Sequence, residues 1–174
     1  MTKKFILLFL FFTIILTTSK INAQTYKTGI GFRLGGISSG ISVKHFMGST
    51  AALEGILSFG SHYAMLTGLY EKHNAFPKTE GLNWFYGGGA HVGFYSDKWG
   101  YQYFYYKHHG NNIKIEEVDY YGNRSSFGLD FILGLDYKFK NVPINLSLDV
   151  KPFFDITPGF YGYWEPGLSF RFTL

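Results

Sequence analysis

The sequence predicts an all-β fold, an eight-stranded antiparallel up-and-down transmembrane β-barrel, on three observations. Segments along most of the chain alternate between apolar and polar residues, the period of a strand with two different faces. Aromatic residues make up 21% of the chain and glycines number 22, whereas only 16% of the residues are charged. The apolar faces are too long and too numerous to pack inside a soluble sandwich. We therefore expect them to contact lipid while the polar faces line a closed lumen.

The clearest segment is Ser125–Lys140. Its odd positions from Phe127 to Phe139 are all large and apolar, whereas its even positions include Asp130 and Lys138. This pattern predicts a strand with one face toward lipid and the other toward the lumen.

Turn signals separate eight such segments, each close to the 9–11 residues that a tilted strand needs to cross a bilayer. The expected strands are Lys27–Gly35, Ser39–Met47, Ala51–Gly60, Tyr63–Lys72, Leu82–Ser96, Ser125–Lys140, Ile144–Lys151 and Tyr163–Leu174. An even number of strands returns both termini to the same side, which for an exported barrel is the periplasm. Inside turns are then expected near Gly48, Pro77 and Asn141, and outside loops at Gly35–Ser38, Gly60–His62, Asp97–Asn123 and Phe154–Gly162.

Residues 1–23 are predicted to be a cleaved signal peptide and residues 24–174 the barrel domain. Lys3 and Lys4 precede the apolar run Phe5–Leu16, and the small residue Ala23 occupies a cleavage position. As a helix the run would be only about 18 Å long, too short for a hydrocarbon core of about 30 Å. The chain has no cysteine, and therefore neither a lipidation site nor a disulfide framework.

Removal of the leader brings the charge close to neutral. The leader contains three of the 16 basic side chains and none of the 12 acidic ones. Nucleic-acid binding therefore has no support in the composition, and no cofactor is expected.

The lumen face of the expected strands carries both signs of charge in near balance. We expect these residues to form an ionic network that fills the narrow interior of an eight-stranded barrel, because buried charges are tolerated only when paired. Gly87 and Gly89 are expected to make room for long charged side chains opposite them. The expected network is Arg33, Lys44, Glu54, Glu71, Asp130, Asp136, Lys138, Asp149, Lys151, Glu165 and Arg171.

The segment Asp97–Asn123 is predicted to be a β-hairpin outside the membrane, with its turn at Gly110–Asn112. It does not supply two more membrane strands, because Ile113–Tyr121 has charged residues on both faces. Adjacent histidines in a polar loop are more often solvated than metal-bound, so no metal site is predicted. The candidate contact residues of this external loop are Tyr101, Tyr103, Tyr105, Tyr106, His108 and His109.

Several stretches resemble a known family. They are Lys44-His45-Phe46, the run from Ala52 to Leu57, Gly81-Leu82-Asn83-Trp84, and the run from Asn145 to Pro152. On these the chain resembles the small outer-membrane barrels of the OmpA/OmpX type, in particular the barrel-only proteins of Bacteroidetes. The resemblance implies a bacterial outer-membrane location, contact with lipid and lipopolysaccharide, and recognition of the C-terminal strand by the outer-membrane assembly machinery. The chain departs from this family at Leu174, because such proteins usually end in an aromatic residue. Phe170 and Phe172 would then be the aromatic residues that the assembly machinery recognises.

We expect a non-enzymatic monomer with a closed lumen, whose external loops interact with the envelope or the surroundings. Three alternatives remain open: a narrow channel for small solutes, an enzyme that modifies lipid A, and a soluble ligand-binding barrel, which would keep its apolar face inside. The channel is disfavoured by the charges counted in the lumen. The enzyme is disfavoured because neither His62 nor His91 has an evident nucleophile and acid beside it.

Overall fold

The computed structural model describes residues 26–96, 105–109, 112–116, 124–157 and 161–174, which form ten strands. No helix within these ranges is long and apolar enough to cross a membrane. The strands are β1 (Thr28–Leu34), β2 (Gly40–Phe46), β3 (Ala51–Gly60), β4 (Tyr63–Ala75), β5 (Leu82–Tyr95), β6 (Tyr105–His109), β7 (Asn112–Glu116), β8 (Arg124–Lys138), β9 (Ile144–Thr157) and β10 (Tyr161–Thr173).

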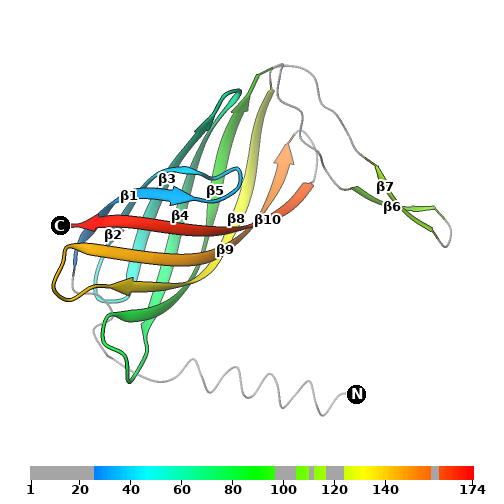
Figure 1. Ribbon diagram of the computed structural model, residues 1–174. Helices are drawn as coiled ribbons and strands as arrows, with labels where there is room; N and C mark the ends of the chain where they lie inside the picture. Colours follow the sequence, from blue (N-terminus) through cyan, green and yellow to red (C-terminus); the bar gives the residue numbers. More distant parts are fainter. Residues whose placement is uncertain (1–25, 97–104, 110–111, 117–123, 158–160) are drawn as a thin grey trace, which may run out of the picture.

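Eight of these strands close into one antiparallel barrel (Figure 1). The order around the ring is β1-β10-β9-β8-β5-β4-β3-β2, and β1 also pairs with β2. The chain therefore winds up and down around the barrel, and the ring closes where the first strand meets the last. This confirms the predicted eight-stranded barrel. The other two strands, β6 and β7, form a separate hairpin within the connection between β5 and β8, as expected for the external segment.

The connections alternate between the two ends of the barrel (Figure 1). The turns at residues 47–50, 76–81 and 139–143 lie at the same end as the C-terminus, and we call this the turn end. The strand ends that the other four connections join lie at the opposite end, the loop end. This is the alternation expected from the sequence.

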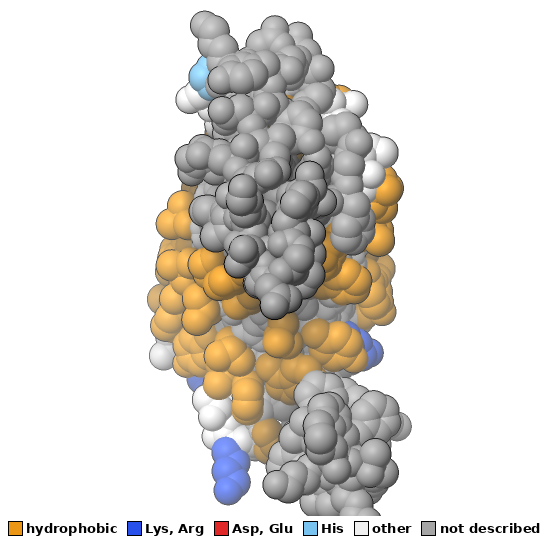
Figure 2. Space-filling model, turned by 90° about the vertical axis from the view of Figure 1, so that its right-hand side faces the viewer, with side chains coloured by type: hydrophobic (Ala, Val, Ile, Leu, Met, Phe, Trp, Pro, Cys, Tyr) orange, Lys and Arg blue, Asp and Glu red, His pale blue; other side chains and the backbone are white. Residues whose placement is uncertain are grey.

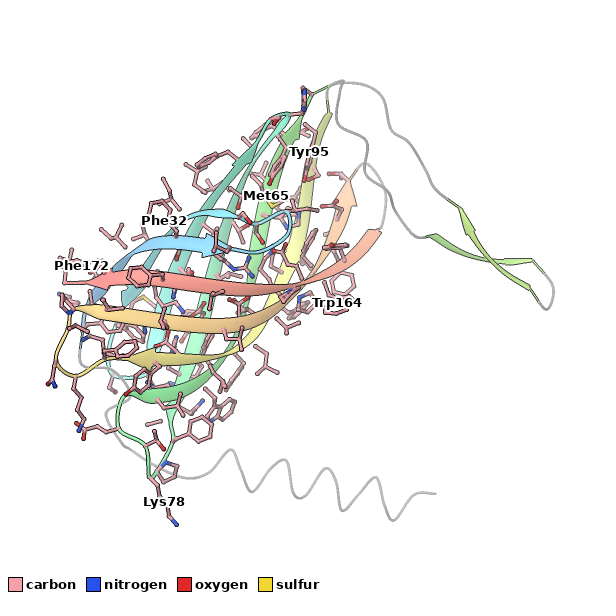
Figure 3. All side chains as sticks on the ribbon, viewed as in Figure 1. Phe32, Met65, Lys78, Tyr95, Trp164 and Phe172 are labelled. Atoms are coloured by element: carbon pink, nitrogen blue, oxygen red, sulfur yellow. The ribbon has the colours of Figure 1, made fainter. Side chains whose placement is uncertain are left out.

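Large apolar side chains cover the outer face of the barrel. They are exposed on every barrel strand, and hydrophobic side chains dominate the middle of the face in Figure 2. Figure 3 shows Phe32, Trp164 and Phe172 projecting away from the barrel. Among the described strand residues, the only ionisable basic side chains at outward-facing positions are His45 and Lys72, both near the turn end. We call this surface the apolar sheath.

Two strands run further than the sequence predicts. β4 continues to Ala75 and β9 continues through Pro152 to Thr157, so much of the loop expected at Phe154–Gly162 is strand instead. Proline lacks the N–H that a ladder needs, which is why the expected strand stops at Lys151. The register of β8 with β9 is the same on both sides of Pro152, with Asp130 opposite Phe153 and Leu133 opposite Val150, and it shifts only between Phe127 and Gly128.

The glycines of β5 have a different role from the expected one. A Cβ atom on Gly87 or Gly89 would collide with backbone carbonyl oxygens of β4, at Tyr70 and Gly68. These glycines therefore allow β4 and β5 to approach closely, and space for charged side chains is secondary.

Candidate functional site

The lumen is the candidate site, because it collects nearly all of the buried charge. Of the residues expected in the ionic network, all but Lys138 are buried inside the barrel, each no more than 3% exposed. Alternation explains this placement, since these residues occupy the positions between the outward apolar ones. Their ion pairs fall into two groups along the barrel.

The turn-side cluster consists of Lys44, Glu54, Glu71, Asp136 and Arg171. Lys44 Nζ lies 3.1 Å from Glu54 Oε2, 2.7 Å from Glu71 Oε2 and 4.0 Å from Asp136 Oδ1. Arg171 Nη2 donates to Glu54 Oε1. Two cations thus hold three carboxylates, two from the neighbouring strands β3 and β4 and one from β8, which is separated from β4 by β5.

Neutral residues complete the coordination of Arg171. Its Nε donates to Ser42 Oγ at 2.8 Å, and its Nη1 donates to Ser147 Oγ at 2.6 Å and to Asn145 Oδ1 at 3.3 Å. Ser42 Oγ in turn donates to Glu54 Oε1 at 2.6 Å. All three nitrogens of the guanidinium are therefore bonded, as a fully buried arginine requires. Ser42, Asn145 and Ser147 are not among the residues expected in the ionic network from the sequence.

The loop-side cluster consists of Arg33, Asp130, Asp149, Lys151 and Glu165. Arg33 lies 2.5 Å from Asp149 through Nη2 and 3.1 Å from Glu165 through Nη1. Lys151 Nζ lies 2.7 Å from Asp130 Oδ1 and 3.7 Å from Glu165 Oε1. The cluster therefore links β1, β8, β9 and β10 across the interior.

His91 extends the loop-side cluster toward the loop end. Its Nδ1 lies 2.7 Å from Asp130 Oδ2 and its Nε2 lies 2.8 Å from Asp155 Oδ1. A carboxylate can only accept, so both ring nitrogens must carry protons for both bonds to form. The geometry therefore fits an imidazolium that bridges two acids. Asp155 was missed because it lies beyond Pro152, where the expected strand ends.

Apolar side chains occupy much of the remaining interior. Ile56, Leu69, Phe85 and Ile132 form one buried cluster, and two smaller groups lie around Phe46 and around Met65. His73 stacks on Phe85 with ring centroids 4.9 Å apart, and Lys44 Nζ lies 4.2 Å from the centroid of the same ring. The lumen is therefore a mixed core, in which buried apolar clusters accompany the paired charges expected from the sequence.

Lys138 is the exception among the expected network residues. It is half-buried at the turn end, and its Nζ donates to the backbone oxygens of Phe139 at 2.6 Å and Val142 at 2.9 Å. With Lys138 outside and Asp155 inside, the described interior holds seven acids against four lysines and arginines. The near balance expected from the sequence is therefore wrong, and His91 supplies part of the missing positive charge.

The interior offers little chemistry beyond charge pairing. Within the described ranges, no group of three or more histidine and acidic side chains is arranged to hold a metal ion. Both nitrogens of His91 are bonded to carboxylates, so the ring has no free nitrogen to act as a base toward a hydroxyl. The buried hydroxyls of Ser58, Thr67 and Ser126 have no hydrogen-bond partner among the residues that the structure describes.

The external candidates can be placed only in part. Tyr105, Tyr106, His108 and His109 lie in β6, and their side chains are outside what the structure describes. Tyr101 and Tyr103 lie outside the described residues altogether. Their role in binding stays a prediction.

No protein-family model matches the sequence, and none of the curated proteins compared with it matches either. Among solved structures, the crystal structure of Neisserial surface protein A is similar. The match has a TM-score of 0.43 and 11% sequence identity, and covers 84% of this chain and 93% of that chain. A score at this level does not by itself establish a shared fold or function.

Proposed function

We propose that the chain is a non-enzymatic integral protein of the bacterial outer membrane, of the small-barrel type that its sequence resembles. The observation that carries this proposal is the apolar sheath around a charged interior. A soluble protein rarely exposes a contiguous apolar patch larger than a few hundred Å². A barrel with apolar residues outside and polar residues inside instead matches a lipid surround.

Export through the signal peptide is part of the same proposal. Cleavage after Ala23 would leave Gln24 as the first residue, with the barrel starting a few residues later at Thr28. N-terminal sequencing of the protein from isolated outer membranes should begin at Gln24. An intact leader, or recovery of the protein in the soluble fraction, would contradict it.

The proposed lumen is closed to solutes. The two ionic clusters and the apolar clusters occupy the interior, where Arg171 bonds β10 to β3 across the ring and Arg33 bonds β1 to β9 and β10. Purified protein in planar bilayers should therefore give no stable conductance. A steady open pore would favour the narrow channel instead.

The external part of the proposal concerns the β6–β7 hairpin and the segment around it. Segment 97–123 connects two barrel strands at the loop end, which in an outer-membrane barrel faces outward. Its tyrosines are the residue type that supplies a rigid amphipathic contact surface. We propose that this segment contacts the envelope or molecules outside the cell. Deleting residues 105–116 should leave the barrel folded and should reduce binding of the protein to envelope components or to molecules outside the cell.

Activity on lipid A is the enzymatic alternative, and it needs an activated nucleophile near the outer leaflet. Incubation of the reconstituted protein with lipopolysaccharide, followed by mass spectrometry of the lipid A, tests it directly. We expect an unchanged lipid A mass.

A further inference from the structure

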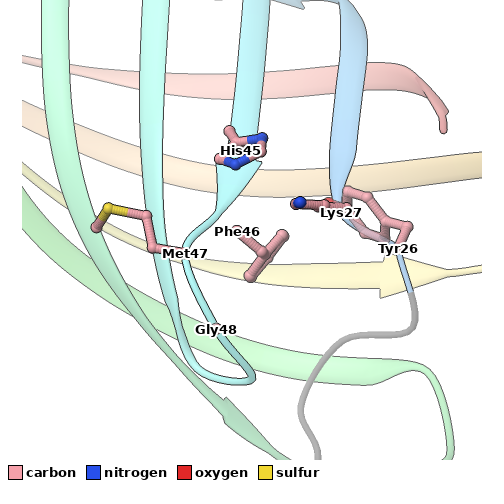
Figure 4. Close-up of a pocket in the computed structure, with 6 residues that line it drawn as sticks. All are labelled: Tyr26, Lys27, His45, Phe46, Met47 and Gly48. Atoms are coloured by element: carbon pink, nitrogen blue, oxygen red, sulfur yellow. The ribbon is translucent and has the colours of Figure 1, made fainter.

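A pocket lies at the turn end of the barrel, between the start of β1 and the end of β2 (Figure 4). Its residues come from both faces of the wall: Tyr26 and Phe46 face the lumen, whereas Lys27, His45 and Met47 are exposed. The residues that line it are Tyr26, Lys27, His45, Phe46, Met47 and Gly48. None of these contributes to the two ionic clusters.

The pocket lies at the lower edge of the apolar sheath. Ile30 and Val43 are paired partners on the outer face, and two residues further toward the turn end the pair is Thr28 with His45. Two strand residues span about 7 Å, so His45 lies less than that distance below the last apolar pair. A change from apolar to polar side chains along one strand pair is what the boundary between hydrocarbon and headgroups calls for.

The exposed side chains of the pocket offer two donors that have no acidic partner. His45 Nδ1 lies 2.9 Å from Thr28 Oγ1. When that hydroxyl donates to Nδ1, the neutral ring carries its proton on Nε2, which has no partner among the described residues. None of the ion pairs among the described residues involves Lys27. Figure 4 shows its side chain extending toward the β2 side of the pocket.

Among the described residues, no acidic side chain pairs with Lys27 or His45. The nearest strand acids, Glu54 and Glu71, face the lumen and are bonded to Lys44 and Arg171. The carboxylate of Leu174, the last residue of the sequence, also lies at this rim, where one of its oxygens accepts from the backbone N–H groups of Lys27 and Thr28, at 3.2 and 3.3 Å, and it is not paired with the Lys27 ammonium. Lys27 and His45 are therefore free to bind an anion from outside the chain.

We propose that this pocket binds the phosphate of a glycerophospholipid from the membrane leaflet at the turn end. Lys27 and His45 donate to the phosphate oxygens, and an acyl chain lies along Ile30 and Val43. The inference rests on the proposed membrane location, and it adds a specific lipid site to it.

The test compares lipid binding by the full barrel in detergent, measured by native mass spectrometry during titration with phosphatidylglycerol. The variant Lys27→Gln/His45→Leu should bind about tenfold more weakly, the loss of roughly one charge-assisted contact. Lys27→Arg should retain binding. Lys78→Gln is the matched control, because Lys78 is exposed on another connection at the same end (Figure 3). It should bind like the wild type.

Three outcomes would overturn the site. These are equal binding by the double variant and the wild type, an equal loss in the Lys78 control, or displacement of the lipid by an equal concentration of inorganic phosphate. Folding is checked by the heat-dependent gel shift, and Lys27→Arg keeps the test informative if the double variant folds poorly. Insertion into phospholipid vesicles is measured separately. A wild-type barrel that fails to insert refutes the proposed function. One that inserts but ignores the Lys27 and His45 changes refutes only the site.

Discussion

Replacing Arg171 with methionine removes one of the two cations of the turn-side cluster. The side chain is 1% exposed and bonds Ser42, Asn145, Ser147 and Glu54. Methionine keeps most of the apolar volume but none of the donors. The substitution therefore tests whether these bonds hold the barrel together.

The magnitude follows from the charges left behind. The intact cluster has Lys44 and Arg171 facing Glu54, Glu71 and Asp136, and without Arg171 a single lysine faces all three acids. Removing one partner of a buried ion pair costs about 3–5 kcal/mol. Glu54 keeps Lys44 at 3.1 Å and Ser42 at 2.6 Å, so we expect the lower part of this range.

The assay is reversible urea unfolding in lipid vesicles, followed by the heat-dependent gel shift and by tryptophan fluorescence. The double variant Arg171→Met/Glu54→Gln restores the original charge of the cluster and should recover roughly 1–3 kcal/mol. Lys140→Met is the control, because its pair with Glu80 is largely exposed and worth at most about 1 kcal/mol. If Arg171→Met cost no more than Lys140→Met, or if the double variant recovered nothing, the ionic core would not be a source of stability.

Three further predictions concern the outer face, the lumen packing and the external hairpin. Leu133→Arg, in the apolar sheath, should cost about 2–4 kcal/mol in vesicles, whereas Val142→Arg, in an exposed turn, should cost about 0–1 kcal/mol; equal costs would refute the lipid face. Gly167→Ala should lower the free energy of unfolding by about 1–3 kcal/mol, because its Cβ would lie 2.5 Å from Arg33 Cζ, whereas Gly55→Ala, with open space around it, should be close to neutral in the same assay. Limited proteolysis of intact cells should cut near Gly110–Asn112 and leave the barrel protected; cleavage only at the turn end would invert the topology.

Alternation was sufficient to predict the barrel and the side of its wall on which most residues lie. Period two fixes the face of every residue once one residue is placed, which is why Glu54 and Arg171 could be assigned to the lumen. The clean pattern of β3 even gave its bounds without error. The signal depends on contrast between faces, and it weakens where both faces are apolar.

That weakness explains the apolar residues missed in the lumen. Met65, Leu69 and Phe85 occupy inward positions, but in the sequence they blur the alternation of their strands. An apolar residue facing inward costs nothing by itself, so no local rule marks it. Leu69 and Phe85 become part of a core only because they pack against Ile56, which belongs to a different strand.

Lys138 and Asp155 show the limits at strand ends. Lys138 has the inward parity, but a long side chain at the last residue of a strand can reach the carbonyls of the turn, and it does so at Phe139 and Val142. Asp155 also occupies an inward-facing position, but it lies beyond Pro152, where the expected strand ends. Its partner His91 comes from β5, and a contact between residues so far apart in sequence has no local signature.

The seam between β1 and β10 has a consequence for how the barrel can form. It pairs Gly29 with Thr173, so the ring closes only when the two ends of the domain meet. Contacts between residues so far apart in sequence form slowly, because the chain loses loop-closure entropy before the contact contributes any favourable free energy. Until then the edges of β1 and of the last strand to have paired are both open, and an open edge is a template for aggregation. The chain must therefore be kept apart from other copies of itself until β10 has paired with β1. A truncation within β10 would remove that pairing and leave the barrel open between β1 and β9.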